Sequence, residues 1–143
     1  MHTKEEKMEA FGRLLDVLDV LREKCPWDRK QTYESLRPNT IEEVYELCDA
    51  LIKDDTDNIC KELGDVLLHI CFYAKIGSEG RRFDVADVCN KLTDKLIFRH
   101  PHVYHSSQIG AKEPKPLPYG EKSDEDVSGE MLTANTAQQV IEN

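Results

Sequence analysis

The sequence predicts an all-α fold, an antiparallel bundle of helices that a second copy of the chain completes. Apolar residues recur at three- and four-residue steps in four long segments, which is the period of amphipathic helices. A polar, turn-prone stretch at residues 53–58, KDDTDN, predicts that the chain reverses between the second and third segments. Residues 66–74 are apolar around nearly the whole helical circumference, and four helices from one copy are too few to cover them.

Length and charge limit the classes of function. At 143 residues the chain is one domain by length, and its formal charge of −9 argues against binding to nucleic acid or to an anionic membrane surface. No apolar run reaches the roughly 18 residues of a spanning helix, and the charged N-terminus lacks the apolar core of a signal peptide, so we expect a cytoplasmic protein. Five cysteines without a C-x-x-C pair fit neither a disulfide framework nor a zinc site, and those in helical segments are expected to be core residues.

The first helix is expected over residues 4–24, and Pro26 ends it. Residues 25–40 contain two prolines and little periodicity beyond two possible turns around residues 31–36, so they are expected to form mostly an ordered loop. The sole tryptophan, Trp27, lies in this loop. A loop tryptophan is more often a plug of the core than a ligand contact, although both roles are open.

The second long helix is expected to begin at a capping box, Thr40 with Glu43, and to run to about residue 53. Opposite its apolar face, Glu42, Glu46 and Asp49 form an acidic stripe, with Glu43 at the edge. Most acidic stripes are solvated surfaces, so this stripe alone does not indicate a site.

The third helix, expected from residue 56 or 57, gives the acidic stripe a second interpretation. Glu62 and Asp65 lie on its buried side, where unpaired carboxylates cost several kilocalories per mole, and we expect no Lys or Arg one turn away to pair them. The reversal at residues 53–58 would bring these carboxylates to those of the second helix. A cluster of oxygen ligands favours Mg²⁺ over zinc. His69, one turn beyond Asp65, is expected to be a hydrogen-bonded core histidine or to orient a metal ligand.

The fourth helix is expected to begin after Asp84 and to stop at Pro101. Near its end, Lys95 and Arg99 share a face, either to complement the helix dipole or to bind phosphate. Residues 105–134 are rich in Pro, Gly, Ser and charge and are expected to form a polar, disordered insert. A weak helical pattern returns at residues 135–143, the expected start of a truncated helix.

With these residues in view, the chain resembles the MazG family of all-α nucleoside triphosphate pyrophosphohydrolases. The resemblance rests on CPWDRKQTYESLRP at residues 25–38, E-E-x-x-E at 42–46, E-x-x-D at 62–65 and RFDVADVCNKLTDKLIFRHPHVY at 82–104. It implies that residues 1–104 form the catalytic helical domain. The metal ligands that it implies are Glu43, Glu46, Glu62 and Asp65, and the residues that contact the triphosphate are Lys95 and Arg99. In the family the final helix continues from a V-x-x-N pattern, here Val140 to Asn143, into a tryptophan that assists the nucleotide. This sequence stops just before that position, so nucleotide affinity is the property that we expect to be affected.

The function implied is Mg²⁺-dependent hydrolysis of ribo- or deoxynucleoside triphosphates at the α–β bond, releasing a monophosphate and pyrophosphate for housecleaning of the nucleotide pool. Mn²⁺ is a possible substitute for Mg²⁺. Glu42 is the candidate group that orients or deprotonates the attacking water, and a homodimer or a dimer of dimers is expected. The paired acidic motifs also occur in dUTPases and phosphoribosyl-ATP pyrophosphohydrolases, and a non-enzymatic, metal-binding helical protein is a further alternative.

Overall fold

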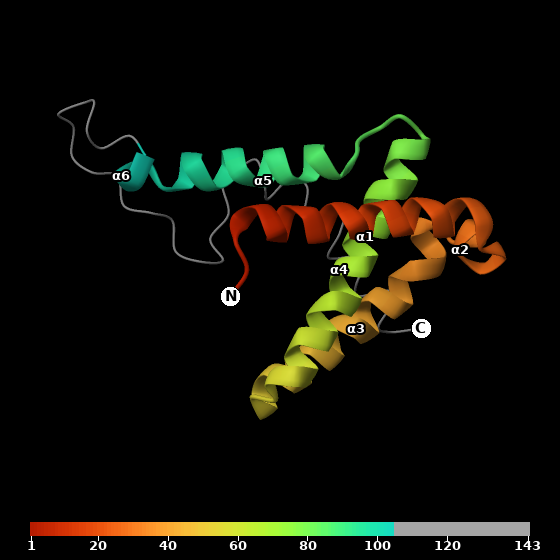
Figure 1. The fold of residues 1–143 in the computed structure, drawn as a ribbon, viewed down its shortest axis with the longest axis horizontal. Helices are drawn as coiled ribbons and strands as arrows, with labels where there is room; N and C mark the ends of the chain where they lie inside the picture. Colours follow the sequence, from red (N-terminus) through yellow and green to blue (C-terminus); the bar gives the residue numbers. More distant parts are fainter. Residues whose placement is uncertain (105–143) are drawn as a thin grey trace. The chain divides into compact units, whose positions relative to one another are not determined.

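The computed structural model describes residues 1–104, which form helices joined by turns and short links (Figure 1). The prediction of an all-α fold is confirmed for this part of the chain. By packing, the chain divides into two compact units, Met1–Val88 and Cys89–Asn143. The two expected segments at residues 105–134 and 135–143 lie outside the described residues. The helices are α1 Lys4–Lys24, α2 Pro26–Lys30, α3 Tyr33–Lys53, α4 Thr56–Glu79, α5 Val85–Arg99 and α6 Pro101–Tyr104.

Helix α1 has the predicted bounds because strong local signals mark both of its ends. The Glu6 amide donates to Thr3 Oγ1 at 3.1 Å, and the Thr3 amide donates to Glu6 Oε2 at 2.9 Å, which forms a capping box. At the other end, Pro26 takes the first position of α2, where its missing N–H removes no helical hydrogen bond.

The expected loop at residues 25–40 and the expected helix start at Thr40 are both wrong. Helix α2 occupies Pro26–Lys30, and α3 begins at Tyr33 with a capping box between Thr32 and Ser35. Pro38 lies inside α3. It deprives one carbonyl of its donor near the start of the helix, a local loss that the packing of α3 outweighs. Thr40 is therefore an interior residue of α3, and its hydroxyl donates to the Leu36 carbonyl at 3.0 Å.

Helices α3 and α4 form an antiparallel pair, as the turn at residues 53–58 predicts (Figure 1). Asp54 ends α3 in the left-handed conformation, with φ of 52°, and Asp55 accepts the Asn58 amide at 3.3 Å to begin α4. These short polar residues are well suited to such a reversal.

Helix α4 is buried on one side in the described part of a single chain, in line with the expectation that one copy cannot cover it all around. The core of the first unit consists of Leu18, Leu36, Cys71 and Phe72. On another side of α4, Leu63, Leu67 and Ile70 are 52%, 36% and 46% exposed, because α1 and α3 cover only part of its circumference. Of the helical cysteines, Cys71 is buried, but Cys48, Cys60 and Cys89 are exposed, so they are not core residues of the single chain.

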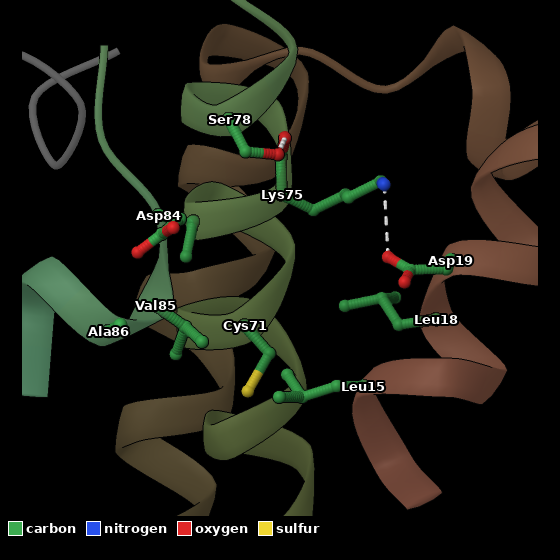
Figure 2. A pocket seen from close by; sticks show the side chains of 10 residues that line it. Leu15, Leu18, Asp19, Cys71, Lys75, Ser78, Asp84, Val85 and Ala86 are labelled. Atoms are coloured by element: carbon green, nitrogen blue, oxygen red, sulfur yellow. Dashed lines mark hydrogen bonds and ion pairs between the residues drawn. The ribbon is translucent and has the colours of Figure 1, made fainter. Parts of the chain in front are cut away.

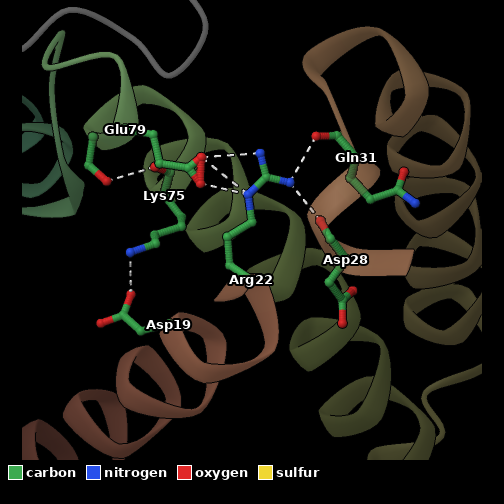
Figure 3. Close-up of polar contacts among 7 residues, drawn as sticks. Asp19, Arg22, Asp28, Gln31, Lys75 and Glu79 are labelled. Atoms are coloured by element: carbon green, nitrogen blue, oxygen red, sulfur yellow. Dashed lines mark hydrogen bonds and ion pairs between the residues drawn. The ribbon is translucent and has the colours of Figure 1, made fainter. Parts of the chain in front are cut away.

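Arg22 joins three helices of the first unit (Figure 3). Its guanidinium donates to the carboxylate of Glu79 on α4, with Nε 2.6 Å from Oε1, and to the carbonyl oxygens of Asp28 and Gln31 at 2.6 and 2.9 Å. The Arg22 side chain is 14% exposed and lies over the Phe72 ring at 5.5 Å. This arrangement fastens the middle and the C-terminal end of the α2 segment to α1 and α4.

The start of α5 follows the sequence prediction. The amides of Asp84 and Asp87 donate to each other's carboxylates at 2.9 and 3.1 Å, which caps the helix. Helix α5 ends at Arg99, and Pro101 opens the short helix α6.

Candidate metal centre

Three carboxylates converge between α3 and α4. Glu43 comes from α3, and Glu62 and Asp65 come from α4. One oxygen from each lies within 4.8 Å of the other two. Residues three apart on a helix share a face, so α4 presents its pair together, and the antiparallel packing of α3 brings Glu43 opposite them.

Two oxygens of this cluster are buried without a hydrogen-bond partner among the described residues. The Glu62 side chain is 6% exposed, and its Oε2 has no hydrogen-bond partner among the described residues; the same is true of the buried Glu43 Oε2. Burial raises the pKa of Glu43, and the charges of Glu46, Asp65 and Glu62 raise it further. An unpaired buried carboxylate is costly, and hard oxygen donors match a hard divalent cation, so these residues fit such an ion.

A lysine does reach the cluster, contrary to the sequence prediction. Lys61 Nζ is 3.0 Å from Glu62 Oε1 and 3.4 Å from Asp65 Oδ2, and these hydrogen bonds, the one to Glu62 first, raise the pKa of Lys61. Lys61 precedes Asp65 by four residues, the spacing at which helical ion pairs form, so the sequence prediction overlooked a contact that residue spacing indicates. The Lys61 side chain is 65% exposed and carries one positive charge against three negative ones, so the cluster remains acidic.

The other two acidic candidates lie at the edge of the cluster. Glu46 is exposed on α3, one turn after Glu43, and after burial its negative charge is the next cause of the raised pKa of Glu43. It is not among the three carboxylates that converge. Glu42 is also exposed. The ligand role of Glu46 and the catalytic role of Glu42 therefore remain predictions.

The predicted substrate-binding residues lie on other helices. Trp27 lies on α2 and is 76% exposed, so the expectation that it plugs the core is wrong. Lys95 and Arg99 lie on α5, within the second compact unit. That all three contact a substrate remains a prediction.

A polar group next to the cluster was only partly predicted. His69 is 8% exposed and hydrogen-bonded, as expected, but its partner is Thr40, which also contacts the Tyr73 hydroxyl. The capping signal assigned to Thr40 hid this role. The signal that points to it is the i, i+3 spacing of Thr40 and Glu43 on the face of α3 toward α4.

A separate hollow of about 320 Å³ lies between α1, α4 and the start of α5 (Figure 2). Cys71 and Leu18 contribute apolar surface, and Lys75 and Asp19 form an ion pair of 2.9 Å at its edge. None of the three clustered carboxylates lines it. The hollow is therefore distinct from the candidate metal centre.

Comparisons with known proteins agree on one family. A family model described as the MazG nucleotide pyrophosphohydrolase domain matches residues 31–104. A nucleoside triphosphate pyrophosphohydrolase of Escherichia coli K12 is 44% identical over 103 residues, covering 70% of this chain and 39% of that protein. A protein of Thermotoga maritima named nucleoside triphosphate pyrophosphohydrolase/pyrophosphatase MazG is 48% identical over 99 residues, covering 68% and 39%.

The fold has a solved counterpart. The crystal structure of a mazG-related protein from Thermotoga maritima matches with a TM-score of 0.59 and 27% identity, covering 69% of this chain and 87% of that chain. This chain spans 39% of the length of the two curated relatives described above. Among the described residues, no helix is both long enough and apolar enough to cross a bilayer.

Proposed function

This chain belongs to the MazG nucleotide pyrophosphohydrolase family, and from that premise we propose that it hydrolyses nucleoside triphosphates to a nucleoside monophosphate and pyrophosphate. The observation that supports the proposal most directly is the buried Oε2 of Glu62, which lies beside the carboxylates of Glu43 and Asp65 and has no hydrogen-bond partner in the described part of the chain. Such a group is unfavourable in an inert helical protein and useful in one that binds a cation with a polyphosphate.

Glu43, Glu62 and Asp65 would hold Mg²⁺, or Mn²⁺ in its place, and Glu46 is the proposed fourth ligand. When bound, a divalent cation would offset the charge of the phosphates and lower the pKa of the attacking water. The carboxylates fix where that positive charge can lie, and the burial of Glu62 strengthens its attraction for the cation. Lys61 offsets part of the repulsion among them before substrate arrives.

Other residues of the chain would bind and orient the substrate. Glu42, next to a ligand but outside the cluster, is the proposed group that orients or deprotonates the attacking water. Lys95 and Arg99 would bind phosphate oxygens, since ionised donors form the stronger hydrogen bonds with them. Trp27, exposed on α2, is a further proposed contact for the nucleotide.

The proposed active unit is a homodimer or a dimer of dimers. Support comes from the apolar face of α4, where Leu63, Leu67 and Ile70 are exposed in the single chain. We also propose a cytoplasmic protein that acts in housecleaning of the nucleotide pool. The acidic surface charge gives no support for nucleic-acid or membrane partners.

A substrate panel tests the proposal. The protein is incubated with canonical, deoxy and oxidised nucleoside triphosphates and with phosphoribosyl-ATP, with Mg²⁺ or with chelator, and monophosphate and pyrophosphate are quantified. We expect both products in equal amounts with Mg²⁺, none with chelator, and a loss of turnover by orders of magnitude in Asp65→Ala. Glu9→Gln, an exposed change on α1, is the matched control.

The outcomes separate the alternatives. Turnover of dUTP or phosphoribosyl-ATP alone would assign the chain to one of those related activities. A folded protein that yields no monophosphate from any member of the panel would refute the enzymatic proposal and favour a metal-binding or interaction role.

A further inference from the structure

A buried polar contact joins α3 to α4 on one side of the carboxylate cluster. The hydroxyl oxygen of Thr40, on α3, lies 2.5 Å from His69 Nδ1 and 2.5 Å from the Tyr73 hydroxyl, both on α4. The same oxygen is 3.0 Å from the carbonyl oxygen of Leu36, one turn back on α3. His69 is 8% exposed, and both Thr40 and Tyr73 are partly buried.

The hydrogen atoms of this contact can be assigned from its partners. Thr40 has one hydroxyl proton, and the Leu36 carbonyl can only accept, so the proton goes to Leu36. The two lone pairs of Thr40 then accept from His69 Nδ1–H and from the Tyr73 hydroxyl, which satisfies all three contacts. Burial lowers the pKa of His69, against a smaller opposing effect of the Asp65 charge, and so favours the neutral ring.

The polar contact lies within about one helical turn of the metal centre on both helices. Thr40 precedes Glu43 by three residues, and His69 follows Asp65 by four, which correspond to about 4.5 and 6 Å along the helix axes. Because α3 and α4 are antiparallel, both offsets point the same way along the pair. The contact is therefore well placed to fix the two helices where they carry the carboxylates.

The polar contact opposes the repulsion between the carboxylates of α3 and those of α4. Without a cation, Glu43 on α3 is repelled by Glu62 and Asp65 on α4, and the repulsion favours separation of the two helices. Lys61 belongs to α4, and among the described residues its ion pairs are with α4 carboxylates only, so it does not tie α3 to α4. The directional bonds of Thr40 do tie them, and they specify both the separation and the register.

We propose that Thr40, His69 and Tyr73 are positioning residues that hold α3 and α4 together in the metal-free protein and so keep Glu43 at ligand distance from Glu62 and Asp65. The inference rests on the proposed metal site and assigns its preorganisation to a contact that touches neither cation nor substrate. A residue beyond the ligands that orients them typically changes metal affinity by about 10–100-fold.

The test measures Mn²⁺ affinity directly, from the electron paramagnetic resonance signal of the free ion, without substrate. Thr40→Val keeps the shape and removes the hydroxyl, and we expect about 10-fold weaker binding. Thr40→Ser restores the hydroxyl and should restore the affinity. Tyr73→Phe should weaken binding in the same direction by less, because His69 keeps its bond to Thr40.

Thr93→Val is the matched control. Thr93 Oγ1 donates to the carbonyl of Cys89, also one turn back, at 2.9 Å, but it is exposed on α5. Its loss reproduces the removal of a threonine hydroxyl from a helix without removing the Thr40 contacts. Urea unfolding of every variant establishes that the protein titrated with Mn²⁺ is folded.

A purely structural role would lower the free energy of unfolding while leaving the Mn²⁺ affinity of the folded protein unchanged. Parent-like affinity in folded Thr40→Val overturns the inference, and if that variant does not fold, parent-like affinity in Tyr73→Phe does so. A parent protein that binds no Mn²⁺, or binds it equally well after Asp65→Ala, overturns the metal site itself and this inference with it.

Discussion

Replacing Glu62 by Gln should make the metal-free protein more stable and the metal-loaded protein no more stable than the parent. The substitution keeps the size of the side chain and removes one buried negative charge. It also removes a buried carboxylate oxygen, Oε2, that has no hydrogen-bond partner among the described residues, and it introduces an amide donor beside carboxylate acceptors. In chelator, both changes favour the folded state.

The size of the effect follows from the separation of the charges. Two unit charges 4.8 Å apart, the span of the cluster, repel by about 0.9 kcal/mol at a dielectric constant of 80 and by about 3.5 kcal/mol at 20. Losing the Glu62 contact with exposed Lys61 offsets part of this gain. A net gain of about 1–2 kcal/mol is expected, or roughly 3–8 °C in Tm for a chain of this size.

A bound cation stabilises the parent more than it stabilises Glu62→Gln. At a concentration 100 times its Kd, a cation stabilises the parent by about 2.7 kcal/mol. If Glu62→Gln weakens binding 10–100-fold, the same concentration stabilises the variant by only about 1.4 to 0.4 kcal/mol. The difference, about 1.3–2.3 kcal/mol, is about as large as the advantage of the variant in chelator.

Urea unfolding gives the free energy of unfolding of the parent, of Glu62→Gln and of the exposed control Glu9→Gln, each in chelator and in Mg²⁺. The control should track the parent in both buffers. Equal destabilisation of Glu62→Gln with and without Mg²⁺ would contradict the reasoning, because it would show that the carboxylate serves packing rather than a cation.

Three further predictions concern other parts of the chain. Lys95→Ala or Arg99→Ala should weaken nucleotide binding with little effect on the free energy of unfolding. The difference in affinity from the parent, measured by calorimetry, should shrink at high salt. Equal affinities of variant and parent at low salt would indicate that both residues only complement the helix dipole. Hydrogen bonding from Arg22 lowers the pKa of Glu79 below 4.5, so this pair stabilises the folded state above that pH and loses its effect as pH falls through the lower value. Glu79→Gln should therefore lower the free energy of unfolding by about 0.5–1 kcal/mol at pH 7, and the gap should narrow in urea titrations below pH 4.5. Light scattering should give a dimer or tetramer that Leu67→Glu dissociates, whereas a fully active monomer of about 16 kDa would refute the oligomer.

Helix ends were predictable where one signal acted alone. Thr3 with Glu6 begins α1, and Asp84 with Asp87 begins α5, in both cases through reciprocal contacts between residues three apart. The start of α3 was not, because the sequence offers two candidate caps, at Thr32 and at Thr40. Pro38 between them favoured the later one, although the tertiary packing of α3 is strong enough to retain a proline in its second turn.

The metal centre was predictable to the extent that helix geometry determines it. Spacing places Glu62 and Asp65 on one face of α4, and the polar reversal predicts that α3 lies opposite that face. The position of Glu43 beside them therefore follows from two local signals. The contact of Lys61 with Asp65 was also predictable, since the two residues are four apart on α4, whereas the contact of Lys61 with the adjacent Glu62 depends on the rotamer of a long side chain. Periodicity likewise marks Leu67 as apolar without identifying which neighbour covers it.

Thr40 shows why the polar contact beside the centre could not be found from local pattern. Along the chain, its neighbour three residues ahead is Glu43, and a threonine followed by a glutamate at that spacing is a capping box. Inside a helix, the same hydroxyl gives its one proton to the carbonyl four residues back, which leaves two lone pairs that α3 cannot use. Those lone pairs accept hydrogen bonds from His69 and Tyr73, which are 29 and 33 residues away along the chain. The function that we infer for Thr40 therefore depends on its being interior to α3, and once that is known the capping role is excluded.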